Sequence, residues 1–249
     1  GGCSAGTAET SSVPTTTATQ SAALSERDAY IAAGAAPLNP ADWAHGEFVG
    51  AIDLQYFGAR TSATAQAADA KYAEYFKGNF TPPAPGERNV IRLNAMGDPR
   101  DGDRLLYLGA IMDNITLPNE IVLGLHNITR IEGGVEVNGE RFEGRVAGAN
   151  GTLVVGDRMT IWVTDAIYPE LVNKYVYEVV ASESGGDYEV VDVGPGFEDI
   201  IYRASPSEDV YQLSLYTCWP PNQSIRRLVT RFHLVDVVIE EGSVKPLDA

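Results

Sequence analysis

Residue types that could carry out chemistry on a carbonyl group flank one short turn near the end of the chain. Cys218 closes the alternating segment 211–218, and Arg226 and Arg227 open the next alternating segment, 226–240. A cysteine thiolate is a strong nucleophile, and a guanidinium offers several fixed N–H donors to carbonyl oxygens or to an oxyanion. Together they indicate attack on an acyl group, provided that both side chains face one groove.

Strand alternation predicts which of these side chains share a face. Successive residues of a strand point to opposite faces, so Cys218 leaves its segment on the more polar face. In the segment that begins at Arg226, the more apolar alternate set is expected inside, which leaves Arg227 on the polar face; that set is Leu228, Thr230, Phe232 and Leu234. Segments joined by so short a turn are expected to be antiparallel neighbours. Cys218 and Arg227, rather than Arg226, should therefore line one groove.

A nucleophilic thiol also needs a base or cation nearby, because an unperturbed thiol is only a few per cent thiolate at pH 7. His45 is expected at the surface, and His233 lies in a strand among apolar neighbours, as a barrel-wall residue would. His126 follows the apolar run 120–125 and begins a polar loop, which makes it the best candidate. The alternative for Cys218 is an inert buried cysteine, since free cysteine is among the most buried residue types.

The elements that must position these residues differ along the chain. Residues 1–21 are predicted to be a flexible Ser/Thr-rich linker, and 22–82 a helical N-terminal region with segments at 21–35, 39–59 and 62–78. Beyond the Pro-rich break the apolar period changes to two, so 83–249 is predicted to be a β-barrel domain, and it contains Cys218, Arg227 and His126. The expected strands are 89–93, 104–108, 120–125, 152–155, 159–164, 174–180, 188–193, 211–217 and 227–240. The fold class is therefore mainly β, an antiparallel β-barrel with an N-terminal helical appendage.

Charge and cysteine use exclude some classes of partner. With 34 acidic and 18 basic residues the net charge is −16, which disfavours binding to nucleic acid. No apolar run is long enough to span a bilayer. Cys3 follows small residues and precedes a polar tract, as at the mature start of a bacterial lipoprotein, so lipidation of Cys3 with a membrane tether is one interpretation and a plain tail is the other. A disulfide between Cys3 and Cys218 is disfavoured by geometry, and no metal-ligand spacing or EF-hand pattern indicates a metal or another cofactor.

An ordered set of motifs resembles one known family. SLYTC at 214–218, with Arg227 nine residues after the cysteine, resembles the TLxTC strand and downstream arginine of the sortases, bacterial cysteine transpeptidases of the cell surface. The segments 89–93, 117–127 and 156–163 with 174–180 resemble other strands of that family in the same order. The resemblance covers roughly residues 86–240.

The chain also departs from the family pattern. Ser214 replaces the first threonine of the motif, and Leu125 stands where a glycine precedes the histidine, with Gly124 one place earlier. The gap from His126 to Cys218 is nearer to that of members with an inserted helix before the cysteine strand. The Asp-Pro-aromatic lid motif is absent, because Asp98 and Pro99 are followed by arginine.

The resemblance implies a sortase-type transpeptidase on the extracellular side of the cell membrane. Cys218 would attack the Thr-Gly amide of an LPxTG-like sorting signal on a secreted protein, His126 would protonate the leaving amine, and Arg227 would hold substrate carbonyls and the oxyanion. The substrate-binding residues implied are Ser214, Tyr216 and Thr217. The acceptor would be an amine such as a peptidoglycan cross-bridge or a pilin lysine, with no cofactor; calcium, which some members bind, is not indicated.

Two alternatives stay open. The chain could be a sortase-like cysteine peptidase that mainly hydrolyses, which the sequence does not separate from a transpeptidase. It could also be a catalytically silent barrel that binds surface peptides or proteins, an outcome favoured if Leu125 displaces His126 from the thiol.

Overall fold

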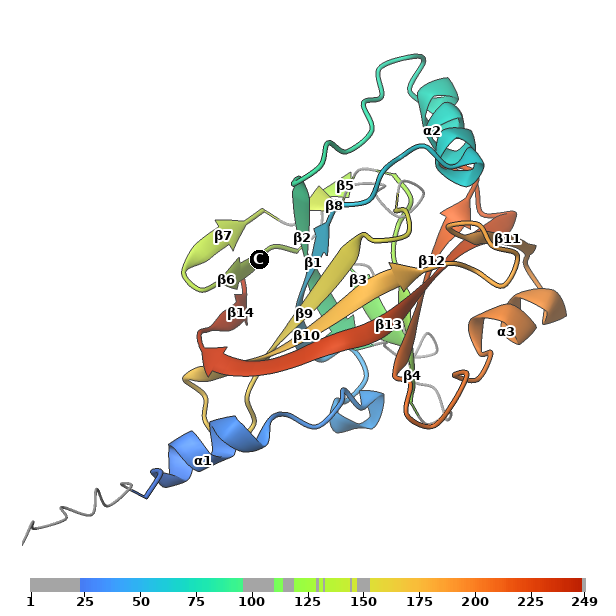
Figure 1. Cartoon of the computed structure of the whole chain (residues 1–249). Coiled ribbons are helices and arrows are strands. Elements are labelled where there is room, and N and C mark those ends of the chain that lie inside the picture. The colour runs from blue at the N-terminus through green and yellow to red at the C-terminus, as the bar shows by residue number, and fades with distance from the viewer. Residues whose placement is uncertain are drawn as a thin grey trace, which may run out of the picture. The chain divides into compact units, whose positions relative to one another are not determined.

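A computed structural model describes residues 23–95, 110–113, 119–128, 130–131, 133–143, 145–146 and 153–247 (Figure 1). The chain divides into two units, 1–33 and 34–249. Among the described residues, the first unit holds helix α1 (Glu26–Ala33), and the second holds every strand. The predicted linker 1–21, Cys3 and the predicted strand 104–108 lie outside the described residues.

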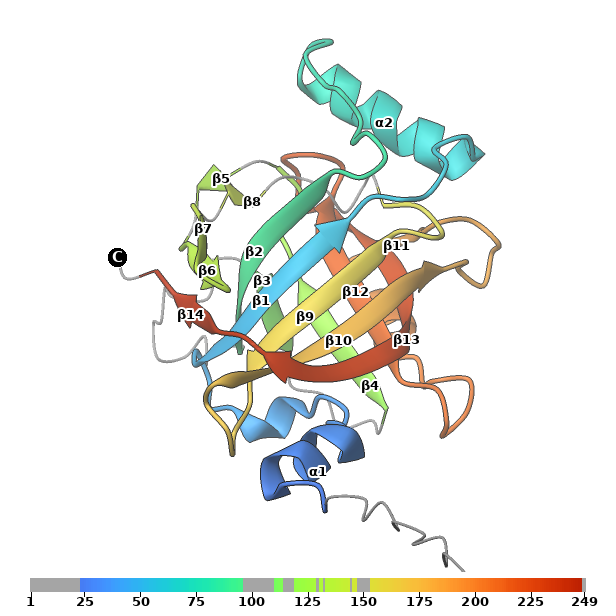
Figure 2. The ribbon, with the colours of Figure 1, turned by 60° about the vertical axis from the view of Figure 1, so that its left-hand side comes forward.

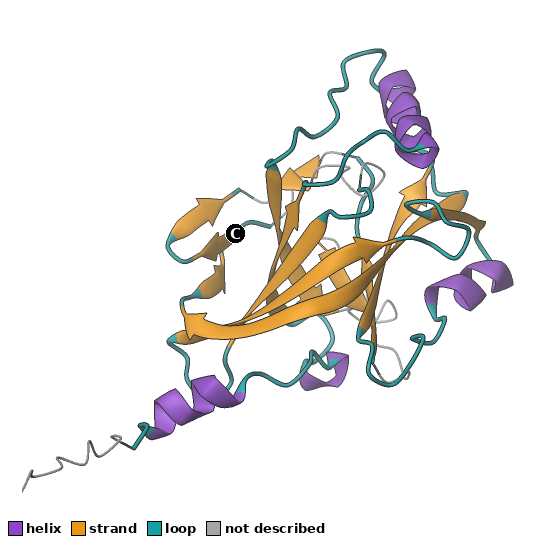
Figure 3. Ribbon diagram, in the orientation of Figure 1, coloured by secondary structure: helices purple, strands orange, loops and turns teal. Residues whose placement is uncertain are grey.

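The second unit is built on a sheet of nine strands, in the order β10-β9-β1-β2-β3-β4-β12-β13-β11. Strands are drawn in orange in Figure 3. Because β10 also pairs with β13, eight of these strands form a closed ring of pairings, and β11 adds to β13. The nine strands are β1 (Phe48–Gln55), β2 (Arg88–Ala95), β3 (Ala110–Asp113), β4 (Glu120–Gly124), β9 (Arg158–Thr164), β10 (Leu171–Val180), β11 (Glu189–Asp192), β12 (Gln212–Trp219) and β13 (Arg226–Glu241). The smaller strands are β5 (Arg130–Ile131), β6 (Val135–Val137), β7 (Glu140–Phe142), β8 (Arg145–Val146) and β14 (Val244–Pro246).

The mainly β barrel is thus confirmed, with a difference in strand direction. Most neighbours in the ring are antiparallel, but β2–β3 and β4–β12 are parallel. Apolar alternation reports which face of a strand is buried, and it carries no information about the direction of a neighbour that is distant in the chain. The parallel pairing of β4 with β12 matters for the site, because it brings the ends of both strands to the same end of the barrel.

The helical prediction for 22–82 is wrong at β1. α1 and α2 (Ala63–Tyr75) are helices and η1 (Pro40–Asp42) is a single 3-10 turn, but 48–55 is a strand paired with both β2 and β9. Six of its eight residues are buried, and an apolar run buried on both faces cannot be told from a buried helix by its period. The barrel therefore begins before residue 83.

Close packing of β1 against β9 explains the glycine at position 50, where an added Cβ would lie 1.8 Å from the Trp162 carbonyl oxygen.

Of the other strand predictions, those at 89–93, 120–125, 159–164, 174–180, 188–193, 211–217 and 227–240 are confirmed to within three residues at each end. The prediction at 152–155 is wrong for its described part, because 153–155 belongs to no strand. None of the helices in the described part of the chain has the length and apolar character that crossing a membrane requires.

Two helices brace the end of the barrel that carries Cys218. In Figure 2 the arrowhead of β1 points toward α2, which follows it in the chain. Ser62 caps α2 by accepting from the Ala65 N–H, and Tyr72 of the helix packs with Trp219, the residue after Cys218. Helix α3 (Pro195–Ile201) lies between β11 and β12 in the chain and covers the outer face of the sheet. It is an inserted helix of the kind that the long gap before Cys218 suggested.

Candidate active site

Cys218 and Arg227 lie directly opposite each other on β12 and β13. Directly opposed residues of an antiparallel pair share a face, with Cβ atoms about 4.5–5.5 Å apart. Leu228, Thr230 and Phe232 are buried, and Phe232 belongs to the main core inside the barrel, as strand alternation predicts. Cys218 and Arg227 are both half-buried on the outer face, and Cys218 is a free thiol.

The Arg227 guanidinium is held by its own turn and by α3. Its Nη1 donates to the Ser224 carbonyl at 2.8 Å and to the Arg226 carbonyl at 3.0 Å. The centre of the guanidinium lies 6.0 Å from the centroid of the Phe197 ring. Arg226, in contrast, is exposed and pairs with Asp192 at 2.9 Å.

His126 is brought to the same place by the parallel pairing of β4 with β12. The N–H of Leu125 donates to the Tyr216 carbonyl at 3.0 Å, and the side-chain amide of Asn127 donates to the carbonyl of Cys218. Leu125 is buried in the core inside the barrel. Alternation continued past β4 therefore places His126, which is half-buried, on the outer face. The residues on either side of it, Leu125 and Asn127, are hydrogen-bonded to Tyr216 and Cys218 of β12.

The other two histidines lie elsewhere. His233 is opposite Gln212 and six residues along β13 from Arg227, a separation of about 20 Å in a strand. Burial, and secondarily the neighbouring Arg231, lowers the pKa of His233, which favours the neutral imidazole. His45 is exposed and lies just before the start of β1. Cys218 lies near the other end of β1, because α2 follows that end in the chain and packs against Trp219.

The predicted substrate contacts need two corrections. Thr217 is fully buried on the inner face of β12, so it cannot reach a substrate that lies on the face of Cys218. Ser214 is on the outer face but is also fully buried, because its hydroxyl is engaged by Glu120 and Arg231. Tyr216 remains: it is half-buried on the face of Cys218, and its ring meets that of Phe197 edge-on with centroids 5.5 Å apart.

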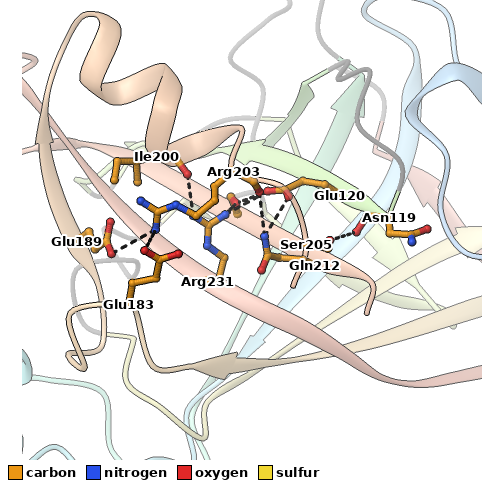
Figure 4. A network of polar contacts seen from close by, with 10 residues as sticks. Asn119, Glu120, Glu183, Glu189, Ile200, Arg203, Ser205, Gln212 and Arg231 are labelled. Carbon is orange, nitrogen blue, oxygen red and sulfur yellow. Dashed lines mark hydrogen bonds and ion pairs between the residues drawn. The ribbon is translucent and has the colours of Figure 1, made fainter. Parts of the chain in front are cut away.

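A buried polar network underlies α3 on this same face (Figure 4). The Glu120 carboxylate, whose side chain is 0% exposed, accepts from Arg231 at 3.1 Å, Ser214 at 3.0 Å and Gln212 at 3.0 Å. Arg231 also donates to the Ile200 carbonyl of α3 at 2.7 Å. Burial raises the pKa of the Glu120 carboxyl, and the hydrogen bonds and Arg231 oppose that rise. The network joins β4, β12, β13 and α3.

Sequence reasoning missed this network, although a signal was present. Glu120 opens the apolar run of β4, and Arg231 interrupts the apolar residues of β13. A charged residue within a buried strand needs a partner of opposite charge, and Glu120 and Arg231 carry opposite charges.

A pocket of about 330 Å³ lies beside the network, at the Gln212 end of the strands. Its walls include Glu183, Glu189, Arg203, Gln212, Arg231 and His233. Arg203 pairs with Glu183 at 2.9 Å, so the pocket carries charges of both signs. Cys218 is not among the residues that line this pocket. Within the described part of the chain, no three His, Cys, Asp or Glu side chains gather as a metal site requires.

Comparison with known proteins gives a likeness in fold. No protein-family model and no curated protein matches the chain. Among solved structures, the chain is similar to sortase A of Listeria monocytogenes (14% identity, 61% of this chain and 83% of that chain, TM-score 0.39). It is similar to sortase E1 of Streptomyces coelicolor, solved with a tripeptide in its active site (11% identity, 79% and 94%, TM-score 0.42). It is also similar to the SrtF sortase of Corynebacterium diphtheriae (13% identity, 86% and 95%, TM-score 0.42).

These solved structures are sortases by name, but at identities of 11–14% and TM-scores of 0.39–0.42 the likeness to them carries no argument about what this chain does. The function is therefore argued from the arrangement of Cys218, Arg227 and His126.

Proposed function

We propose that the protein is a sortase-type cysteine transpeptidase that acts on secreted proteins at the cell surface. The observation that carries the proposal is the pairing of Cys218 with Arg227 on one face, at the barrel end to which β4 delivers His126. These are a nucleophile, an oxyanion donor and a proton donor, the three functions that acyl transfer from an amide requires.

In the proposed reaction the Cys218 thiolate attacks the carbonyl carbon of the scissile amide, which is the Thr-Gly bond of an LPxTG-like sorting signal. The Arg227 guanidinium donates to the oxygen as negative charge develops on it. As the C–N bond breaks, the His126 imidazolium gives its proton to the leaving amine, and a thioester on Cys218 remains. An acceptor amine, such as a cross-bridge or pilin lysine, then attacks the thioester carbonyl and gives its proton to the neutral His126 imidazole, and the C–S bond breaks to restore the Cys218 thiolate. The bonds formed and broken balance without a cofactor.

Cleavage of sorting-signal peptides by the purified protein tests this proposal. Cys218→Ala should abolish cleavage, and His126→Ala should lower the acylation rate by at least about a hundredfold, as expected for loss of a general acid. His233→Ala is the matched control, a histidine on the same outer face but far from Cys218, and it should retain activity. Cleavage that survives Cys218→Ala, or a greater loss with His233→Ala than with His126→Ala, would rule out the assignment.

The same experiment separates transpeptidation from hydrolysis. Mass spectrometry of the products with and without an added amine shows whether the acyl group passes to the amine or to water. A protein that binds the peptides without forming an acyl intermediate on Cys218 would instead be the silent barrel.

A further inference from the structure

Asn127 ties the segment that carries His126 to the segment that carries Cys218. Asn127 is 4% exposed, and its Nδ2 donates to the carbonyl oxygens of Cys218 and of Pro220, the second at 3.1 Å. A side-chain amide nitrogen has two N–H groups. Both are therefore used on carbonyls at the end of β12, one of them the carbonyl of the proposed nucleophile itself.

The Asn127 hydrogen bonds lie just beyond the point where the backbone pairing of β4 with β12 ends. The paired register of β4 and β12 ends at Gly124 opposite Tyr216, and the Leu125 N–H extends it by one bond at 3.0 Å. Beyond that bond, the Asn127 side chain takes the place of the backbone. His126 lies between the Leu125 and Asn127 ties, so its backbone is held to β12 from both sides.

We propose that Asn127 is a positioning residue that keeps the His126 imidazole in register with the Cys218 thiol. The catalytic meaning of this register rests on the proposed function. Reacting groups must be held within about 0.5 Å of a productive geometry, and a displacement of about 1 Å can cost a hundredfold in rate. The Asn127 side chain donates to the backbone carbonyls of Cys218 and Pro220 rather than to the thiol, so it acts through the backbone on either side of the pair.

Two variants remove the tie, and one control removes a comparable bond elsewhere. Asn127→Asp keeps the shape of the side chain without its N–H donors, and Asn127→Ala removes both donors and shape. Asn94 is also 4% exposed and donates through Nδ2 to a backbone carbonyl, that of Gly46 at 3.2 Å, so Asn94→Ala is the matched control. Thermal unfolding, single-turnover acylation, and the pH profile of Cys218 alkylation by iodoacetamide are measured for the wild-type protein, for these three variants and for His126→Ala.

We expect Asn127→Asp to lower the acylation rate constant by at least about tenfold while KM changes less than about twofold, because the pair is displaced and the groove is not. Both Asn127 variants should shift the alkylation profile in the direction that His126→Ala shifts it. Asn94→Ala should lose melting temperature but keep the acylation rate and the alkylation profile of the wild-type protein.

Three results would overturn the inference. The first is a folded Asn127→Asp protein with unchanged acylation and alkylation, and the second is an equal effect of Asn94→Ala on both measurements. The third is loss of the folded barrel in both Asn127 variants, which would give Asn127 a role in folding alone. If the wild-type protein cleaves no peptide, the proposed function fails, but the alkylation profiles still decide the role of Asn127. A shift toward the His126→Ala profile would then support the positioning role by itself.

Discussion

Arg227 owes its orientation to two backbone carbonyls and an aromatic ring. Its Nη1 is engaged by the carbonyls of Ser224 and Arg226, and the guanidinium lies over Phe197, whose ring in turn contacts Tyr216. A planar guanidinium can satisfy such carbonyls with one nitrogen and still offer further N–H groups to a substrate, whereas a lysine ammonium is a single point of charge.

Arg227→Lys should therefore lower kcat/KM for a sorting-signal peptide by more than about tenfold, which is roughly 1.4 kcal/mol of transition-state stabilisation. Arg226→Lys is the matched change one residue earlier, where the side chain is exposed and pairs with Asp192, and it should have little effect. Steady-state cleavage by both variants measures the difference. Equal activities, or the greater loss at Arg226, would show that the wrong arginine faces the groove.

Helix α2 braces the strand end that carries Cys218, and Asp187 anchors the helix. The Asp187 carboxylate accepts from the hydroxyls of Ser62 and Thr64 at the start of α2, and from the Val155 N–H at 2.8 Å. Burial alone would raise the pKa of Asp187, but these hydrogen bonds outweigh it and hold the pKa below its ordinary value of 3.8. The charged form of Asp187 is thus favoured in the folded protein.

A lowered pKa has a defined consequence for acid stability. The stabilisation from Asp187 is present above the unfolded-state pKa and is lost as the pH falls through the folded-state pKa. Asp187→Asn should therefore lower the free energy of unfolding at pH 7 by about 1–3 kcal/mol, with the gap to wild type narrowing below about pH 4. Urea unfolding between pH 7 and pH 3 measures this gap. Asp199→Asn, at an exposed position of α3, is the control, and a gap for Asp187→Asn that stays constant with pH would contradict the argument.

The barrel is closed by β13, a strand of 16 residues that pairs with β12, β11 and β10 at different points along its length. Every buried hydrophobic residue of the described chain belongs to the unit 34–249. Burial of apolar surface is the main source of folding free energy, so this unit holds what it needs to fold.

Removal of residues 1–33 should then leave the melting temperature of the remaining chain nearly unchanged, together with its peptide cleavage. Calorimetry and the cleavage assay on the shortened and full chains measure both. A large drop in melting temperature would show that the first unit contributes to the core, and a change in cleavage alone would give that unit a part in substrate access. Lipidation of Cys3 stays a separate prediction, because Cys3 lies outside the described residues.

Local patterns were enough to predict that Cys218 and Arg227 share a face, because side chains alternate in every strand and one turn joins these two strands. They were also enough to place His126 at the end of an apolar strand. Other features depend on segments that meet only in the folded chain. The strand at 48–55 looks helical until β2 and β9 cover its edges, and Ser214 looks available until Glu120 and Arg231 enclose it. Asn127 shows no local signal, since its partners Cys218 and Pro220 lie about ninety residues away and are reached only through the parallel pairing of β4 with β12.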